Sequence, residues 1–147
     1  MNWLFSQPLE VGTQAPEFQA LDQTGKPVTL AGLRGKNVIL VFYPADETSG
    51  CTKQLCEFRD AWGDVQSKNA VVFGVNPAAA GKHEKFVGKF KFPFPLLVDH
   101  GQTIAKLYHA DAFPVPKRTV YLIAPDGVIR YAKRGMPEPA EVLKAAV

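Results

Sequence analysis

The stretch "NVILVFYPADETSGCTKQLCEFRD", residues 37–60, joins a continuous apolar run to a segment with helical periodicity. The apolar run, 37–44, is rich in β-branched and aromatic residues, which is typical of a strand buried on both faces. A helix is predicted over 51–66 because apolar residues recur there at spacings of three and four: Leu55, Phe58, Trp62 and Val65. A buried strand that leads into a helix indicates an α/β sheet.

The pattern continues on both sides of this stretch. Upstream, two short alternating runs, 18–21 and 27–30, predict a hairpin at the N-terminal side. Downstream, the pattern predicts a strand, a helix, a short strand, a short helix, a hairpin and a final helix: 70–75, 77–90, 92–99, 101–109, 119–133 and 138–146. We therefore expect 1–147 to form one α/β domain of thioredoxin-like fold, a mixed sheet flanked by helices with an N-terminal β-hairpin extension.

Composition excludes several classes of function. The chain has 147 residues, of which 17 are basic and 14 acidic, and the net charge of +3 comes without a basic cluster that would bind nucleic acid. The densest basic stretch is best interpreted as a solvated helix face, with a patch for an acidic partner as the alternative: Lys82, Lys85, Lys89 and Lys91. No run approaches the ~18 apolar residues of a membrane span, and no signal peptide is evident, so a cytoplasmic location is expected.

Cys51 lies where the helix after the buried strand is predicted to begin. The backbone N–H groups and the positive end of the helix dipole gather in a first turn and favour a thiolate. Thr48 could cap this helix or hydrogen-bond near the sulfur, and Gly50 permits a close approach. Asp46 and Glu47 would oppose a thiolate, so this interpretation requires them to face solvent.

Cys56, the only other cysteine, follows five residues later. In an ideal helix a five-residue step rises ~7.5 Å and turns the side chain by roughly 140°. The two Cα atoms would then be about 8–9 Å apart, beyond the ~7 Å limit of a disulfide. The pair is therefore expected to stay separate while the helix is intact and to join only after local unwinding. A simpler alternative is that either cysteine is a small core residue.

A metal site receives little support from the sequence. The spacing of Cys51 and Cys56 is not that of a zinc motif. Three histidines form no ligand pattern with them and are expected on the surface or in loops: His83, His100 and His109.

The segment "FYPADETSGCTKQLCEFRD" resembles the active-site segment of peroxiredoxins of the bacterioferritin-comigratory-protein or PrxQ type. The Pro-x-x-x-Thr-x-x-Cys core of that family falls on Pro44, Thr48 and Cys51, and its second cysteine on Cys56. The segments "VGTQAPEF", "FPFPLLVD" and "KRTVYLIAPDGVIR" extend the similarity over most of the chain, and the distant arginine of the family falls on Arg118. The sequence departs from the family pattern at a few positions: Ser49 for Pro, Gln54 for Glu and Ala124 for Asp.

The resemblance implies a thiol peroxidase for hydrogen peroxide and organic hydroperoxides, active in antioxidant defence. Cys51 would be the peroxidatic cysteine and Cys56 the resolving one, joined in an intramolecular disulfide that a thioredoxin would reduce. Arg118 would stabilise the thiolate, Thr48 would orient the peroxide, and Pro44 would shield the sulfur. No metal or organic cofactor is implied. The family type suggests a monomer, although the apolar start of the chain leaves a dimer open: Trp3, Leu4 and Phe5.

Three other uses of a thioredoxin-like fold fit the sequence less well. A disulfide reductase or isomerase would need a CxxC pair, which this chain lacks. A copper-binding module would need a closer cysteine pair and a placed histidine. A non-catalytic holdase would be marked by loss of the sulfur or of the arginine, and the chain has both.

Overall fold

A seven-stranded sheet forms the centre of the computed structural model, which describes residues 7–147. One of its inner strands, β3 (Asn37–Phe42), is buried at every position. β3 pairs in parallel with β4 (Ala70–Asn76) and antiparallel with β6 (Thr119–Ile123). The strand predicted from the apolar run is therefore confirmed, and it is buried on both faces inside the sheet.

The other strands extend the sheet on both sides of this centre, in the order β2-β1-β5-β4-β3-β6-β7. On one side, β5 (Leu96–Val98) runs parallel to β4, and the N-terminal hairpin joins it antiparallel. The remaining strands are β1 (Gln19–Asp22), β2 (Pro27–Thr29) and β7 (Ile129–Arg134). Both predicted hairpins are thus confirmed, and the sheet is mixed as expected.

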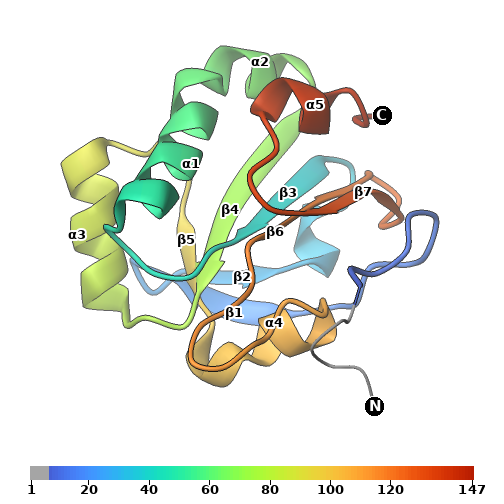
Figure 1. Ribbon diagram of the computed structural model, residues 1–147. Coiled ribbons are helices and arrows are strands. Elements are labelled where there is room, and N and C mark those ends of the chain that lie inside the picture. Colours follow the sequence, from blue (N-terminus) through green and yellow to red (C-terminus); the bar gives the residue numbers. More distant parts are fainter. Residues whose placement is uncertain (1–6) are drawn as a thin grey trace.

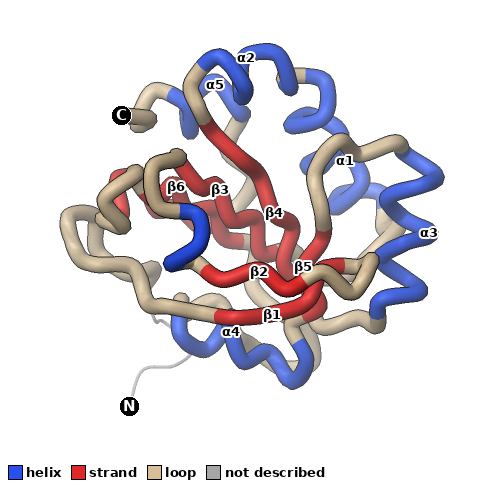
Figure 2. The backbone as a smooth tube through the Cα atoms, turned by 180° about the vertical axis from the view of Figure 1, so that it is seen from behind, coloured by secondary structure: helices blue, strands red, loops and turns tan. Residues whose placement is uncertain are grey.

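Helices cover the two faces of the sheet unequally (Figures 1 and 2). One face carries α1 (Ser49–Asp60), α2 (Trp62–Ser67), α3 (Ala80–Phe90) and α5 (Pro139–Leu143). The opposite face carries α4 (Thr103–Leu107), which follows a short 3-10 turn, η3 (His100–Gln102); a second such turn, η2 (Ala31–Leu33), follows β2.

Alternation along β3 separates two hydrophobic cores. Ile39 and Val41 point into the core beneath α1, α2, α3 and α5, whereas Val38, Leu40 and Phe42 point into the core above α4. This two-sided burial explains the unbroken apolar run in the sequence, because every side chain from Val38 to Phe42 enters one core or the other.

Several predicted elements differ from the structure at their ends. The strand expected over 92–99 is β5 (Leu96–Val98), and the final helix expected over 138–146 is α5 (Pro139–Leu143). The helix expected over 51–66 is two helices that meet at Ala61, whose φ of −94° and ψ of 15° leave the helical region. The change of direction there lets Trp62 pack on Phe94 while Val65 still enters the core. The helix expected from residue 77 begins at Ala80, because the Asn76 side chain instead accepts the N–H of Ala78.

Two further expectations concern the surface and the chain start. The four lysines of the basic stretch are all exposed, which agrees with a solvated helix face. Trp3, Leu4 and Phe5 lie outside the described residues. Within residues 7–147, no helix is long and apolar enough to cross a membrane.

Candidate active site

The register of the sheet brings two distant segments together at one edge. β3 ends at Phe42, and Phe42 is paired with Thr119, the first residue of antiparallel β6. The residue before β6 is Arg118, and the residues after β3 form the loop 43–48, which leads into α1. Arg118 therefore emerges beside the loop and the helix start, as a site at the carboxyl end of a central strand requires.

Cys51 is the third residue of α1, and its backbone is helical. Thr48 occupies the N-cap position in an extended conformation, and its carbonyl accepts the N–H of Thr52 at 2.9 Å. Its exposed hydroxyl makes no capping bond to the helix but donates to the Ala45 carbonyl at 3.4 Å. Of the two roles expected for this hydroxyl, the capping role is therefore wrong.

The Arg118 guanidinium lies against the first turn of α1. A methyl group added at Gly50 would be only 2.8 Å from Arg118 Nη2, so the missing side chain of glycine makes room for the cation. Arg118 Nη1 donates to Gln54 Oε1 at 3.1 Å, and the fully buried Gln54 side chain also reaches the Gly135 carbonyl at 3.4 Å. The Gly135 N–H in turn donates to the Arg118 carbonyl at 2.9 Å. This arrangement fixes a positive charge one residue from Cys51.

Cys56 is not part of this group. It lies further along the same helix, is half-buried, and packs against the core beneath α1. Burial raises the pKa of its thiol above the ordinary cysteine value; nearby Asp60 adds to the rise, while Arg59 opposes it. With α1 intact, burial therefore disfavours the thiolate form of Cys56.

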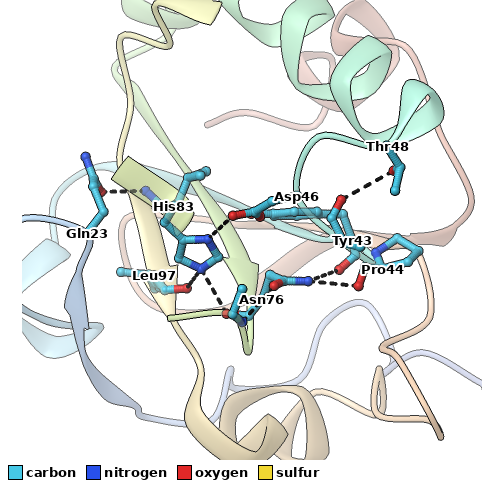
Figure 3. Close-up of polar contacts among 11 residues, drawn as sticks. Gln23, Tyr43, Pro44, Asp46, Thr48, Asn76, His83 and Leu97 are labelled. Atoms are coloured by element: carbon cyan, nitrogen blue, oxygen red, sulfur yellow. Dashed lines mark hydrogen bonds and ion pairs between the residues drawn. The ribbon is translucent and has the colours of Figure 1, made fainter. Parts of the chain in front are cut away.

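The loop 43–48 is held from below by buried polar side chains (Figure 3). Half-buried Pro44 offers its carbonyl to the Asn76 side chain at 3.0 Å. Asp46, which the thiolate interpretation required in solvent, is instead buried: its carboxylate accepts the Tyr43 hydroxyl and lies 2.6 Å from His83 Nδ1. Its negative charge is therefore directed at these two partners, so the interpretation no longer depends on solvent exposure. The exposed Glu47 beside it follows the expectation and pairs with Lys89 on α3.

His83 also differs from the expectation of a surface or loop histidine, because it is fully buried within α3. The sequence did carry a signal for this burial. His83 shares the spacing of three and seven residues with Phe86 and Phe90, which places it on the apolar face of the helix. His100 and His109 are exposed, as expected.

Comparison with known proteins identifies the family. Residues 11–132 match the AhpC/TSA family. A putative peroxiredoxin bcp of Coxiella burnetii is 37% identical over 129 residues, which cover 82% of this chain and 85% of that protein. The chloroplastic peroxiredoxin Q of japonica rice is 40% identical over 131 residues. Those residues cover 87% of this chain but only 60% of the rice protein, so the chain spans about three fifths of that relative's length.

Solved structures agree with this assignment. The crystal structure of peroxidoxin BcpB from Mycobacterium tuberculosis superposes with a TM-score of 0.87 at 29% identity, covering 94% of this chain and 96% of that one. A cysteine-to-serine mutant of PrxQ from Xylella fastidiosa superposes with a TM-score of 0.84 at 25% identity, covering 92% of this chain and 94% of that one. The thioredoxin-like fold is therefore confirmed, and the chain belongs to the AhpC/TSA family, among the peroxiredoxins of the Q or bcp type.

Proposed function

We propose that this chain is a thiol-dependent peroxidase in which Cys51 reduces hydrogen peroxide and organic hydroperoxides. The observation that carries the proposal is the position of Cys51 in the first turn of α1, with the Arg118 guanidinium packed against Gly50. A helix N-terminus and a fixed cation both stabilise a thiolate, which is the nucleophile. Membership of the peroxiredoxins makes a peroxide the substrate to test first.

The first step transfers one oxygen atom to sulfur. The Cys51 thiolate attacks one oxygen of the peroxide, the O–O bond breaks, and the other oxygen leaves with a proton as water or alcohol. Cys51 becomes a sulfenic acid. Arg118 and the N–H groups of the helix start would stabilise the charge that develops on the peroxide oxygens. The exposed Thr48 hydroxyl would orient the peroxide, and Pro44 would limit access of water to the sulfur.

The second step joins the two cysteines. The Cys56 thiol condenses with the sulfenic acid, a disulfide forms, and water leaves. Both cysteines belong to one continuous helix, α1, so its first turns must unwind before the sulfurs can meet. A dithiol reductant of the thioredoxin type would then attack the disulfide and restore both thiols.

Steady-state peroxide consumption in the presence of thioredoxin and its reductase tests this function. Cys51→Ser should remove consumption altogether, because no other residue is proposed to attack the peroxide. Cys56→Ser should consume one equivalent and then stop, because the sulfenic acid has no partner. Sustained turnover by Cys51→Ser would refute the assignment of the nucleophile, and sustained turnover by Cys56→Ser would mean that an external thiol resolves Cys51.

A further inference from the structure

A buried hydrogen-bond network lies beneath the loop 43–48, and the chemistry proposed above does not use it (Figure 3). The side chains of Asp46 and His83 are both fully buried and 2.6 Å apart, between Oδ2 and Nδ1. The Tyr43 hydroxyl donates to the other carboxylate oxygen, also at 2.6 Å. Asp46 belongs to the loop that enters α1, whereas His83 belongs to α3, so the pair ties two elements together.

The surroundings of His83 fix where its protons are. Its Nε2 lies 3.1 Å from the carbonyl oxygens of Asn76 and of Leu97, which can only accept, so Nε2 carries a hydrogen. The Nδ1 of His83 and the Oδ2 of Asp46 then share one further proton between them. Whichever of the two atoms holds that proton, one hydrogen bond joins them, and loss of either partner would leave a buried polar group without it.

A second attachment acts on the backbone of the same loop. The Asn76 side chain, at the end of β4, donates to the carbonyl of Tyr43 at 2.9 Å and to that of Pro44 at 3.0 Å. The loop is thus held through its backbone carbonyls at residues 43 and 44 and through the side chain of Asp46. The ends of β4 and β5 and the helix α3 provide these attachments, and all three lie outside α1.

The attachments end where the backbone is strained. Glu47, the residue after Asp46, has a φ of +58°, a left-handed conformation that is uncommon for a residue with a side chain. Its ion pair with Lys89 is exposed to solvent and contributes little to holding it. Thr48 follows as the exposed N-cap of α1. The tether at Asp46 therefore fixes Glu47 and the direction in which α1 starts, and this direction must change when the first turn of α1 unwinds.

We propose that His83 is a positioning residue for the peroxidase reaction, which acts by holding Asp46. The pair fixes the loop that carries Pro44 and Thr48, and it makes Glu47 the hinge about which the first turn of α1 unwinds. This role rests on the proposed function of Cys51. The intact network favours the folded arrangement that reacts with peroxide and opposes the unwound one that forms the disulfide.

Opposite effects on the two chemical steps are the signature of this role. In His83→Leu and in Asp46→Ala, the rate constant for reduced protein with hydrogen peroxide should fall roughly ten- to a hundredfold, because the loop is misplaced. The rate constant for the following disulfide formation should rise severalfold, because the helix start unwinds more readily. Rapid-mixing kinetics followed by acid quench and mass measurement separates the two steps.

A conservative variant distinguishes positioning from charge. In Asp46→Asn, the side-chain oxygen can accept the Tyr43 hydroxyl and the amide can donate to His83 Nδ1, so both bonds survive. Both rate constants should then stay near their wild-type values. The matched control is Val65→Ala. Val65 lies in α2, away from the loop, and the substitution removes buried volume from the hydrophobic core beneath α1, α2, α3 and α5. It should lower the melting temperature and leave both rate constants unchanged.

Several outcomes would overturn this role. They are unchanged rate constants in folded His83→Leu and Asp46→Ala, a shift of both steps in the same direction, or Asp46→Asn behaving like Asp46→Ala. If the single variants fail to fold, the double variant Asp46→Ala/His83→Leu removes both partners and should show the same opposite effects.

Amide hydrogen exchange of the reduced protein tests, without any peroxide, whether the Asp46–His83 pair holds the loop 43–48. Exchange at residues 47–52 should be faster in His83→Leu than in wild type, and equal exchange would refute the tether. A wild-type protein that does not react with peroxide would instead refute the proposed function, and with it the positioning role of His83. The two failures are therefore distinguishable.

Discussion

Gly50 is the residue at which α1 and Arg118 come closest. Gly50→Ala should keep or slightly raise stability, because alanine is favoured over glycine in helices by up to ~1 kcal/mol. The new methyl group would nevertheless displace Arg118 Nη2, which lies 2.8 Å from its position. We expect the rate constant with peroxide to fall by about tenfold or more, as when a preorganised charge donor is moved. Stopped-flow kinetics and a thermal melt measure the two effects.

Gly88→Ala is the matched control for this substitution. Gly88 lies in α3, and an added methyl group would meet no atom within 4 Å. It should give the same gain in helix propensity without loss of reactivity. An equal loss of reactivity in both variants would mean that Arg118 does not act through its position at Gly50.

The Cys56 thiol offers a prediction on pH. Burial raises its pKa, so at a given pH less of it is thiolate than of a cysteine in an unfolded chain. In Cys51→Ser it is the only thiol of the protein. Its thiolate absorbance should therefore appear at higher pH in the folded variant than in the same variant in denaturant. A folded-state titration at or below the denatured one would contradict the burial of this side chain.

Residues that act locally could be predicted from the sequence, and residues that act across elements could not. The helix-start position of Cys51 and the close approach at Gly50 both follow from the few residues around them. The burial of Asp46 depends on His83, which is 37 residues away and on another helix. The loop sequence alone favours solvent for a carboxylate, and only the packing of α3 supplies the partner that lets it be buried.

The proposed disulfide requires α1 to be helical when the cysteines are reduced and unwound at its start when they are oxidised. Amide exchange across residues 49–56 should be much faster in the disulfide form, because the intrahelical hydrogen bonds of the first turns are lost. Residues 80–90 of α3 should exchange equally in both forms. Equal exchange across 49–56 in the two forms would show that the cysteines meet without unwinding.

Element types followed from hydrophobic periodicity, but element ends did not. The strands β3, β4 and β6 are each buried runs, and their pattern is unambiguous. The break at Ala61 leaves no mark in the apolar spacing, because Phe58 before it and Val65 after it both enter the same hydrophobic core. The late start of α3 likewise reflects the Asn76 side chain, which hydrogen-bonds to Ala78 and to the loop after β3.

At the scale of the whole molecule, the sheet order creates the site. Central β3 has parallel β4 on one side and antiparallel β6 on the other. The end of β3 therefore meets the end of β4, which carries Asn76, and the start of β6, which Arg118 precedes. The start of α1 therefore lies beside the Arg118 cation, and the loop before α1 is hydrogen-bonded to Asn76. The fold class was predictable from the alternation of strands and helices, whereas this pairing needed the strand order.

Whether Cys51 attacks the peroxide and Cys56 resolves it is tested by the mass of the reduced protein after one equivalent of hydrogen peroxide, followed by proteolysis without reductant. We expect an intact mass lower by two hydrogen atoms and a single cross-linked peptide that joins Cys51 to Cys56 within one chain. Cys56→Ser should instead gain one oxygen atom on Cys51. An unchanged wild-type mass, or oxygen retained on Cys56 with Cys51 unmodified, would contradict the assignment of Cys51 as the peroxidatic cysteine.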